Sequence, residues 1–396
     1  MRAMNSNTST LAIRPEAELL LRSARVRIDA ETAARIEALA SNTIDWDYLI
    51  SIGTLNRVLP LLYRTLNQVC PNIVPAAILD FLREYFHLNT KRNFFLTSEL
   101  LKLLKVFEQQ GISAISFKGP LLAASIYGSI ALRQFSDLDI LVHKQDIIKA
   151  KQVLISQGFA STDSHNDSAE NSDFVRDVGE IKIKVDLQWR ITPKLFSFDS
   201  DRVWNHLEPF SLWGGTVLTF TPDMLLLILC VHGWKHRWQR LKWVCDVAQL
   251  IELIQNNNRE IVFEQSIHKG NRRMLSLGLL LAHELLGAAL PASVLQNIRS
   301  DSTVKSVAIP VRNKLFVEPR QASSEGARTI FYFKMMESWG ERPQHCFQYL
   351  VGSIFSPTSI ERSLLPLPRG LTFLYYAFRP LRLLLKYASR PFKRDG

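Results

Sequence analysis

Two short segments restrict the fold of this chain, because their acidic or basic residues alternate with apolar ones. The segment DLDILV (137–142) begins with such alternation, and EIKIKVDLQWRI (180–191) alternates along its length. Alternation is typical of a β-strand, since successive side chains of a strand point to opposite faces of the sheet. Asp137 and Asp139 are therefore expected to project from one face of the same strand.

The hydrophobic period changes twice along the chain, and these changes predict an α+β fold. Residues 14–110 carry apolar residues at three- and four-residue steps, as helices do. ISAISF (112–117) is a candidate buried strand, and the helical period returns after residue 221. We predict a small mixed-sheet core flanked by helical N- and C-terminal regions. The expected divisions are 1–104 (helical), 105–205 (core), 206–300 (helical) and 301–396 (helical, with a basic tail).

The region between the two alternating segments contains a predicted helix and a predicted loop. QDIIKAKQVLISQGF, which follows the first segment, has a helical pattern. STDSHNDSAENSD (161–173) is polar and has no periodicity, so we predict a loop there.

Composition excludes several classes of protein. The 396 residues suffice for two or three structural units, and the hydrophobic content of 47% excludes wholesale disorder. The four cysteines show no CxxC spacing, and the N-terminus lacks the apolar core of a signal peptide. The longest apolar stretches are interrupted by His232, His283 and Glu284, short of the roughly 20 residues that span a bilayer. A cytoplasmic protein is expected, and its net charge of +11 suits an anionic partner.

A third carboxylate, Asp186, lies in the second alternating segment. Neighbouring carboxylates repel each other unless a cation lies between them. Hard oxygen ligands of this kind select Mg²⁺, with Mn²⁺ as an alternative ion. Asp137, Asp139 and Asp186 therefore form a candidate catalytic and metal-binding set. The alternative interpretation is that Asp137 starts a strand beside a turn, and that Asp139 and Asp186 are edge residues paired with nearby lysines or arginines.

The order of these segments resembles the polymerase-β-type nucleotidyltransferase superfamily. ISFKGPLLAASIYG, ALRQFSDLDILV, KVDLQWRI and HGWKHRWQRLKWVCDVAQL, in that order, resemble a bacterial family labelled "uncharacterised nucleotidyltransferase". The resemblance covers roughly residues 15–260 and includes DWDYLI…LPLLYRTL. It implies that Asp137 and Asp139 are the metal-binding pair and Asp186 the third carboxylate. Gln188 is a departure, because such proteins often have histidine there.

The phosphate-binding signature of the superfamily is an apolar residue, a glycine, and then Gly or Ser at the end of the first strand. YGS (127–129) fits this signature by letters, but only seven residues separate Ser129 from Asp137. That is too few for a helix of two turns and a return into the next strand. We therefore place the phosphate loop at Lys118 and Gly119, just before a predicted helix. The proline that follows lacks an N–H, so phosphate contact is expected to shift to Lys118, Gly119 or later amides.

Several cationic or polar side chains are candidates for contacting the nucleotide. The predicted nucleotide-binding set is Lys118, Gly119, Arg133, Ser136, His232, Lys235 and His236. Lys118 is either a phosphate-neutralising cation or a salt-bridge partner at the strand end. Arg133 is either a substrate clamp or a partner of the acid cluster.

His232 and His236 lie four residues apart on a predicted helix, the spacing of zinc proteases. No glutamate follows His232, and no third ligand is evident, so zinc is not expected. The family resemblance implies that His232, Lys235 and His236, with Arg240, contact the nucleotide or the acceptor. The alternative is that the histidines are core residues capped by Asp246 or a backbone carbonyl.

Aromatic and basic residues elsewhere give weaker indications. Trp234, Trp238 and Trp243 are interleaved with cations, but their near-helical spacing favours the core, and nucleic acid is not favoured as a partner. The C-terminal tail is basic and is either a solvated helix face or a peripheral membrane contact. Its cations are Arg379, Arg382, Lys386, Arg390, Lys393 and Arg394.

The sequence and the resemblance together predict an Mg²⁺-dependent nucleotidyltransferase. It would move an NMP group from an NTP to an unidentified acceptor and release pyrophosphate. The alternative is a non-catalytic nucleotide-binding or regulatory protein that keeps the same fold.

Overall fold

The computed structural model describes residues 14–162, 171–191, 202–257, 271–317, 331–332, 334–335, 364–365 and 367–388. The chain divides into two compact units. One comprises Met1–Thr192 and Phe198–Met336, and the other comprises Pro193–Ser197 and Glu337–Gly396.

The first unit begins with helices, as the hydrophobic period predicts. They are α1 (Pro15–Ser23), α2 (Ala30–Ala40), α3 (Trp46–Asn56), α4 (Leu59–Val69) and the long α5 (Ala76–Gln109). Asp29 and Asp45 accept hydrogen bonds from backbone amides at the starts of α2 and α3, which satisfies donors that have no partner within the helix. Between α3 and α4 the chain turns at Arg57, whose φ of 56° lies in the left-handed region.

A five-stranded mixed sheet forms the centre of this unit, in agreement with the predicted fold class. Its strands are β1 (Ala114–Ser116), β2 (Leu138–Val142), β3 (Ala160–Ser161), β4 (Asn171–Val178) and β5 (Ile181–Gln188). They are ordered β1-β2-β5-β4-β3, with β2 and β5 parallel and the other pairs antiparallel. The predicted loop 161–173 is too long, because β3 includes Ser161 and β4 begins at Asn171. Residues 163–170 lie outside the described residues.

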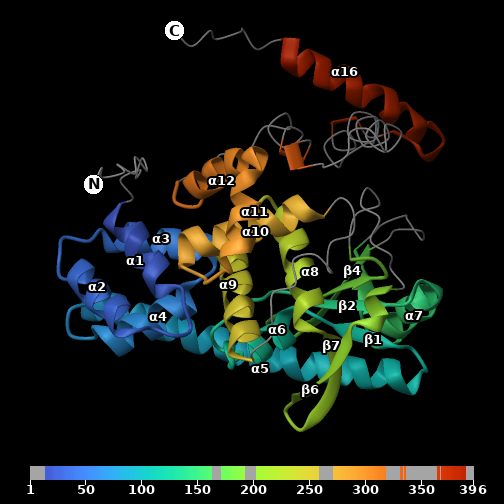
Figure 1. Cartoon of the computed structure of the whole chain (residues 1–396). Coiled ribbons are helices and arrows are strands. Elements are labelled where there is room, and N and C mark those ends of the chain that lie inside the picture. The colour runs from blue at the N-terminus through green and yellow to red at the C-terminus, as the bar shows by residue number, and fades with distance from the viewer. Residues whose placement is uncertain are drawn as a thin grey trace. The chain divides into compact units, whose positions relative to one another are not determined.

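The alternation in β2 and β5 gives the sheet one apolar and one polar face. Leu138, Ile140, Val142, Val185 and Leu187 are buried in a single hydrophobic cluster. This cluster also contains residues of α5 and of α7 (Ile147–Ser156), which follows the short η1 (Lys144–Asp146). In Figure 1, α5 runs along one side of the sheet. The intervening residues of the same strands are therefore left for the opposite face.

Helix α6 (Gly119–Tyr127) connects β1 to β2 and settles which glycine begins it. Gly119 has a φ of 52°, and a Cβ there would lie 3.2 Å from the backbone oxygen of Asp137. Gly128, with a φ of 67°, ends the helix in the left-handed conformation common at helix C-termini. YGS is thus the end of the helix that Gly119 begins, as the spacing predicts.

A two-stranded hairpin begins the region 206–300, which is expected to be a helical domain. After η2 (Arg202–Asn205), β6 (Leu207–Leu212) pairs with β7 (Gly215–Phe220). Trp213 and Gly214 form the turn, and both have positive φ. Positive φ at both central residues is typical of the tight turns that join antiparallel strands. The WGG sequence at this turn was the signal that the helical assignment overlooked.

The remainder of the first unit is helical. Its helices are α8 (Pro222–Lys235), α9 (Leu241–Asn256), α10 (Arg272–Leu286), α11 (Ala292–Ser300) and α12 (Ser302–Lys314). Trp238 is fully buried, and a Cβ at Gly233 would approach its ring to 2.6 Å. Gly233 and Gly278, which have no β-carbon, border the slot that this indole fills, and Trp238 lies in the core as predicted. Within the described ranges, no helix is both long and apolar enough to cross a membrane.

The second unit contains η3 (Arg369–Leu374) and α16 (Tyr375–Ala388) among its described residues. The Tyr375 hydroxyl donates to the Leu365 carbonyl at 2.8 Å and accepts from the Leu367 amide at 2.9 Å. Arg379 is buried, so it does not belong to a solvated helix face as one interpretation of the tail assumes. Arg390, Lys393 and Arg394 lie outside the described residues.

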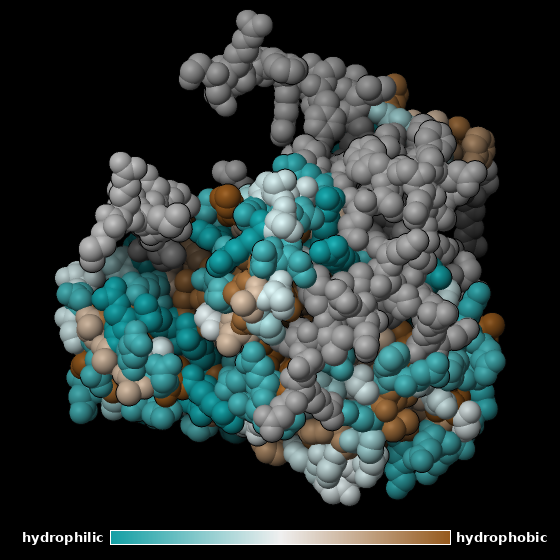
Figure 2. Space-filling model, viewed as in Figure 1, coloured by the Kyte–Doolittle hydropathy of each residue, from teal (hydrophilic) through white to brown (hydrophobic). Residues whose placement is uncertain are grey.

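In Figure 2, apolar residues of the visible described surface form small groups among hydrophilic ones.

Candidate functional site

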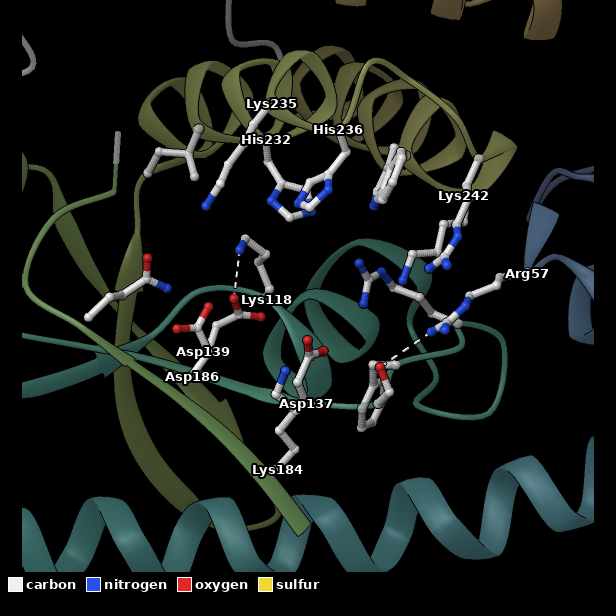
Figure 3. Close-up of a pocket in the computed structure, with 18 of the residues that line it drawn as sticks. Arg57, Lys118, Asp137, Asp139, Lys184, Asp186, His232, Lys235, His236 and Lys242 are labelled. Atoms are coloured by element: carbon white, nitrogen blue, oxygen red, sulfur yellow. Dashed lines mark hydrogen bonds and ion pairs between the residues drawn. The ribbon is translucent and has the colours of Figure 1, made fainter. Parts of the chain in front are cut away.

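A pocket of about 500 Å³ lies on the polar face of the sheet, in the first unit. It is bounded by the end of β1, the start of α6, strands β2, β4 and β5, and helices α8 and α9. Figure 3 shows the three predicted carboxylates on one side and His232, Lys235 and His236 opposite them, carried by the end of α8. The charged lining consists of Arg57, Lys118, Arg133, Lys184, Lys235, Arg240 and Lys242 together with Asp137, Asp139, Asp173 and Asp186. Cations therefore outnumber carboxylates, which favours an anionic ligand.

The structure brings the three predicted carboxylates together. Asp139 lies within β2, directly opposite Asp186 of the parallel strand β5, and Asp137 immediately precedes β2. Burial and the nearby charge of Asp139 raise the pKa of Asp186 to about 6. One of its oxygens, Oδ1, is buried and has no hydrogen-bond partner among the described residues. An unsatisfied carboxylate oxygen of this kind is a favourable ligand for a cation or an acceptor for a substrate hydroxyl.

Asp137 has a different environment from Asp186. Burial alone would raise the pKa of Asp137, but the charges of Lys242, Lys118 and Lys184 outweigh burial and lower it. Asp137 is therefore ionised at neutral pH, whereas Asp186 titrates near it. The site combines one strongly ionised carboxylate with one that can exchange a proton.

Lys118 adopts the salt-bridge role that the sequence left as an alternative. Its Nζ lies 2.6 Å from Oδ1 of Asp139, and both side chains are buried. Lys118 lies between the C-terminal end of β1 and the start of α6, and this position places its ammonium group beside the carboxylates. In Figure 3 the ammonium group lies between Asp139 and the histidine-bearing helix. An ammonium group here compensates part of the repulsion between Asp139 and Asp186.

Arg133 pairs with a carboxylate outside the predicted acid cluster. Its Nε and Nη2 donate to the two carboxylate oxygens of Asp246 in α9, at 2.7 and 2.8 Å, and Tyr127 donates to Oδ1 at 2.7 Å. Burial alone would lower the pKa of Arg133, but Asp246 outweighs burial and raises it. Of the two alternatives for Arg133, pairing with the acid cluster is therefore wrong, because helix packing brings Asp246 to it, and its role as a substrate clamp stays a prediction. Asp246 is likewise engaged by Arg133 and Tyr127, rather than serving as a cap for the histidines.

The two predicted histidines lie together in the pocket wall. The ring centroids of His232 and His236 are 4.6 Å apart, and the His236 ring stacks on Trp243. Withdrawal from water, together with the neighbouring cations Lys118 and Lys235, lowers the pKa of His232 well below its usual value and that of His236 to about 4. Both rings are therefore neutral at pH 7 and act as hydrogen-bonding groups rather than cations.

The remaining predicted residues line the same pocket. Gly119 forms the wall at the start of α6, and Lys235 is exposed at its rim. The Ser136 hydroxyl accepts a hydrogen bond from Nη1 of Arg57 at 3.3 Å. All of the predicted nucleotide-binding residues thus meet at one pocket, although their contacts to a nucleotide stay a prediction.

The described residues offer two neighbouring carboxylates, Asp139 and Asp186, as ligands for a metal ion. In that part of the chain, no group of three His, Cys, Asp or Glu side chains is arranged to hold a metal ion, so Asp137, Asp139 and Asp186 do not form the predicted three-ligand set there. Mg²⁺, however, is usually bound by one or two carboxylates together with waters and substrate phosphates. Asp139 and the unsatisfied oxygen of Asp186 on adjacent strands fit that requirement. The residues present therefore suit a metal ion that arrives with a phosphorylated substrate.

Sequence reasoning missed several pocket residues. Lys184 is two residues from Asp186 on β5 and shares its face, so the alternation that found one could have found the other. Arg57 and Lys242 had no such local signal, because they come from the α3–α4 turn and from α9. Burial, followed by the charge of Arg133, lowers the pKa of Lys242 to about 7. This lysine therefore changes its charge near neutral pH.

Comparisons with known proteins identify a family that matches most of the first unit. The family described as "Uncharacterised nucleotidyltransferase" matches residues 42–287, a span that contains every pocket residue named above. A solved structure of an antigenic nucleotidyltransferase-like protein from Paracoccidioides brasiliensis is similar to 51% of this chain over 96% of its own length, with 15% identity and a TM-score of 0.35. A search of curated proteins gives no match.

Proposed function

We propose that this chain, which belongs to the uncharacterised nucleotidyltransferase family, transfers an NMP group from an NTP to an acceptor and releases pyrophosphate. The observation that carries the proposal is the placement of Asp137, Asp139 and Asp186 on one polar sheet face, opposite a wall of cations. Carboxylates suit a divalent ion, and the cations suit the phosphates that such an ion accompanies.

The residues divide into three roles under this proposal. Asp139 and Asp186 would hold Mg²⁺ or Mn²⁺, which would neutralise charge on the reacting phosphates, and Asp137 would line the same pocket. Gly119 and the amides at the start of α6 would face the phosphates, where the helix dipole favours negative charge. Lys184, Lys235 and Lys242 would neutralise the remaining charge from the other walls.

Asp186 is the proposed base for the acceptor. Its carboxylate lies beside the proposed metal site, where it would be within reach of the acceptor hydroxyl and could take its proton. The acceptor oxygen would form a bond to the α-phosphorus as its proton passes to Asp186. The bond from the α-phosphorus to the bridging oxygen would break at the same time, and the electron pair would leave with pyrophosphate.

The experiment is label transfer from each of the four α-³²P-labelled NTPs, with Mg²⁺ or Mn²⁺ and cell extract as the source of acceptor. Label transfer that is abolished in Asp139→Asn would support the proposal. Asp177→Asn is the matched control, because Asp177 is an exposed aspartate on β4 outside the pocket. Equal transfer by wild type and Asp139→Asn would refute the assignment of the site.

A non-catalytic nucleotide-binding protein is the second candidate, and one contact favours it. Lys118 already provides a cation 2.6 Å from Asp139, where a catalytic protein would need room for a metal ion. Under this alternative, NTP binds without any transfer of label, and binding persists in the presence of EDTA. Metal-dependent binding together with transfer would decide for the enzyme.

A cytoplasmic location is part of the proposal, and the cysteines support it. Cys70, Cys230 and Cys245 are buried free thiols, and burial raises the pKa of each. Free thiols are characteristic of a reducing compartment. Recruitment to a membrane through the basic tail stays a prediction, which liposome binding with and without residues 376–396 would test.

A further inference from the structure

A second cavity of about 560 Å³ lies beside the carboxylate pocket and shares part of its wall. Arg57, Phe135, Ser136 and Arg240 line both cavities, whereas Tyr85 and Arg92 of α5 line only the second. Ser136 immediately precedes Asp137, so a ligand in this cavity would lie next to the carboxylates. We call this second cavity the arginine groove.

The charged residues that line the arginine groove are all cationic. They are Arg57, Arg92 and Arg240, and no acidic side chain is among the described residues that line it. Arg57 donates to the Ser136 hydroxyl at 3.3 Å, and Arg92 donates to the Phe135 carbonyl at 3.2 Å. In the described part of the chain, neither Arg57 nor Arg92 forms an ion pair with a carboxylate.

Arg133 provides a comparison within the same molecule, because it is a buried arginine with a carboxylate partner. Its guanidinium is buried and fully paired with both oxygens of Asp246. Arg57 and Arg92 are half-buried, yet their hydrogen bonds to the described residues go to uncharged oxygens. A partly desolvated guanidinium without a carboxylate retains several donors that match the oxygens of a phosphate. The contrast within one molecule indicates that the groove is kept electropositive for an anionic ligand.

The backbone at Arg57 supports the same conclusion. Arg57 has a φ of 56°, in the left-handed region that residues with a β-carbon rarely adopt. Its position is fixed by the preceding Asn56, which donates to the Leu315 carbonyl and accepts from the Leu241 amide. Figure 3 shows Arg57 reaching toward Asp137 from the side opposite to Lys118. Strain that the surrounding structure holds in place is often found at functional sites.

We infer that the arginine groove binds a phosphate monoester group of the acceptor and so presents the acceptor's hydroxyl to the carboxylate pocket. This inference rests on the proposed function for its second half, because it assigns the carboxylate pocket to the NTP. The binding of a phosphate monoester in the groove can be tested without any catalysis.

The test is calorimetric titration of the full chain with sn-glycerol 3-phosphate. The carboxylate pocket is first filled with Mg²⁺ and whichever of the four α,β-methylene NTP analogues binds best. Wild type is compared with Arg92→Gln, since Arg92 lines the groove and does not line the carboxylate pocket. The matched control is Lys91→Gln, which removes an exposed neighbouring cation of α5 that does not line the groove.

The groove assignment predicts binding by wild type and Lys91→Gln, and a loss of about tenfold to a hundredfold in Arg92→Gln. Affinity for the NTP analogue should be unchanged in Arg92→Gln. The inference is overturned if wild type does not bind glycerol phosphate, or if Arg92→Gln binds it as well as wild type does. It is also overturned if Arg92→Gln weakens the NTP analogue instead, because the groove would then belong to the donor.

Two further comparisons are needed. One distinguishes a lipid from a soluble ester as the source of the phosphate, and the other distinguishes failure of the groove assignment from failure of the proposed function. Tighter binding of monomeric dihexanoyl phosphatidic acid than of glycerol phosphate would identify a lipid as the source, and the reverse would identify a soluble ester; each supports the shared chemistry. Arg92-dependent binding without transfer of label in any condition would refute the proposed function and leave the groove standing. Transfer that proceeds equally well in Arg92→Gln at limiting acceptor would refute the groove alone.

Discussion

Replacement of Asp186 by asparagine should stabilise the folded chain at alkaline pH. The carboxyl of Asp186 has a folded-state pKa of about 6, raised from 3.8 by burial and by the charge of Asp139. At about 1.4 kcal/mol per pH unit, this difference costs the folded state about 3 kcal/mol wherever the carboxylate is ionised. Asparagine has nearly the same shape and no charge, so Asp186→Asn removes that cost.

The sign of the pH dependence follows from the direction of the shift. Because the folded state holds the proton more tightly than the unfolded state, the cost is absent below the unfolded pKa of 3.8 and complete above about 6. Wild type should therefore gain stability from this group as the pH falls. The advantage of Asp186→Asn should be about 3 kcal/mol at pH 8 and about 1.5 kcal/mol at pH 5.

Urea unfolding followed by tryptophan fluorescence measures this difference, with EDTA present to exclude divalent ions. Asp177→Asn serves as the control and should change the free energy of unfolding by less than about 0.5 kcal/mol, since Asp177 is exposed. The reasoning is refuted if Asp186→Asn is no more stable than wild type at pH 8, or if its advantage is the same at pH 5. Addition of Mg²⁺ and NTP should stabilise wild type more than the variant, since the variant lacks a proposed ligand.

Four further outcomes are expected. Lys118→Met removes the ammonium that pairs with Asp139, so Mn²⁺ binding without nucleotide should tighten about tenfold by electron paramagnetic resonance, and unchanged affinity would contradict competition for this carboxylate. Lys242 has a pKa of about 7, so it loses its charge as the pH rises through neutrality. Affinity for NTP, measured by calorimetry, should therefore fall between pH 6 and 8, and the fall should be steeper in wild type than in Lys242→Met. Asp246→Asn leaves a buried guanidinium without its carboxylate and should lose about 3–5 kcal/mol in urea unfolding, and a loss below about 1 kcal/mol would argue against that pairing. Gly233→Ala should lose about 1–3 kcal/mol and shift the tryptophan fluorescence, because its Cβ would meet the Trp238 ring, and an unchanged midpoint would show that the slot can widen.

Local pattern was sufficient to predict the sheet and the acidic face. Alternation in 137–142 and 180–191 gave β2 and β5, and the same period of two placed Asp139 and Asp186 on the face away from the core. The distance from Gly119 to Asp137 gave α6, because a helix and a return have a minimum length. The hairpin 207–220 lies within the region expected to be helical, because its short strands carry too few residues to show alternation clearly, although a turn sequence joins them.

The partners of the charged residues could not be predicted in the same way. Arg133 and Asp246 are 113 positions apart, and their pairing depends on how α9 packs against α6. Lys118 and Asp139 meet because β1 and β2 are antiparallel neighbours, which the sequence does not state. Arg57 reaches Ser136 from the N-terminal helices.

The sequence alone thus determined which residues could form a carboxylate cluster, because strand alternation is a local property of neighbouring residues. Tertiary structure decided which cation neutralises which acid, and it placed Arg57 and Arg92 at a groove where they donate to uncharged oxygens. The physical reason is the distance along the chain over which each feature is decided. Backbone geometry fixes side-chain direction within a strand or helix, whereas the choice of partner follows from the packing of elements that lie far apart in the chain.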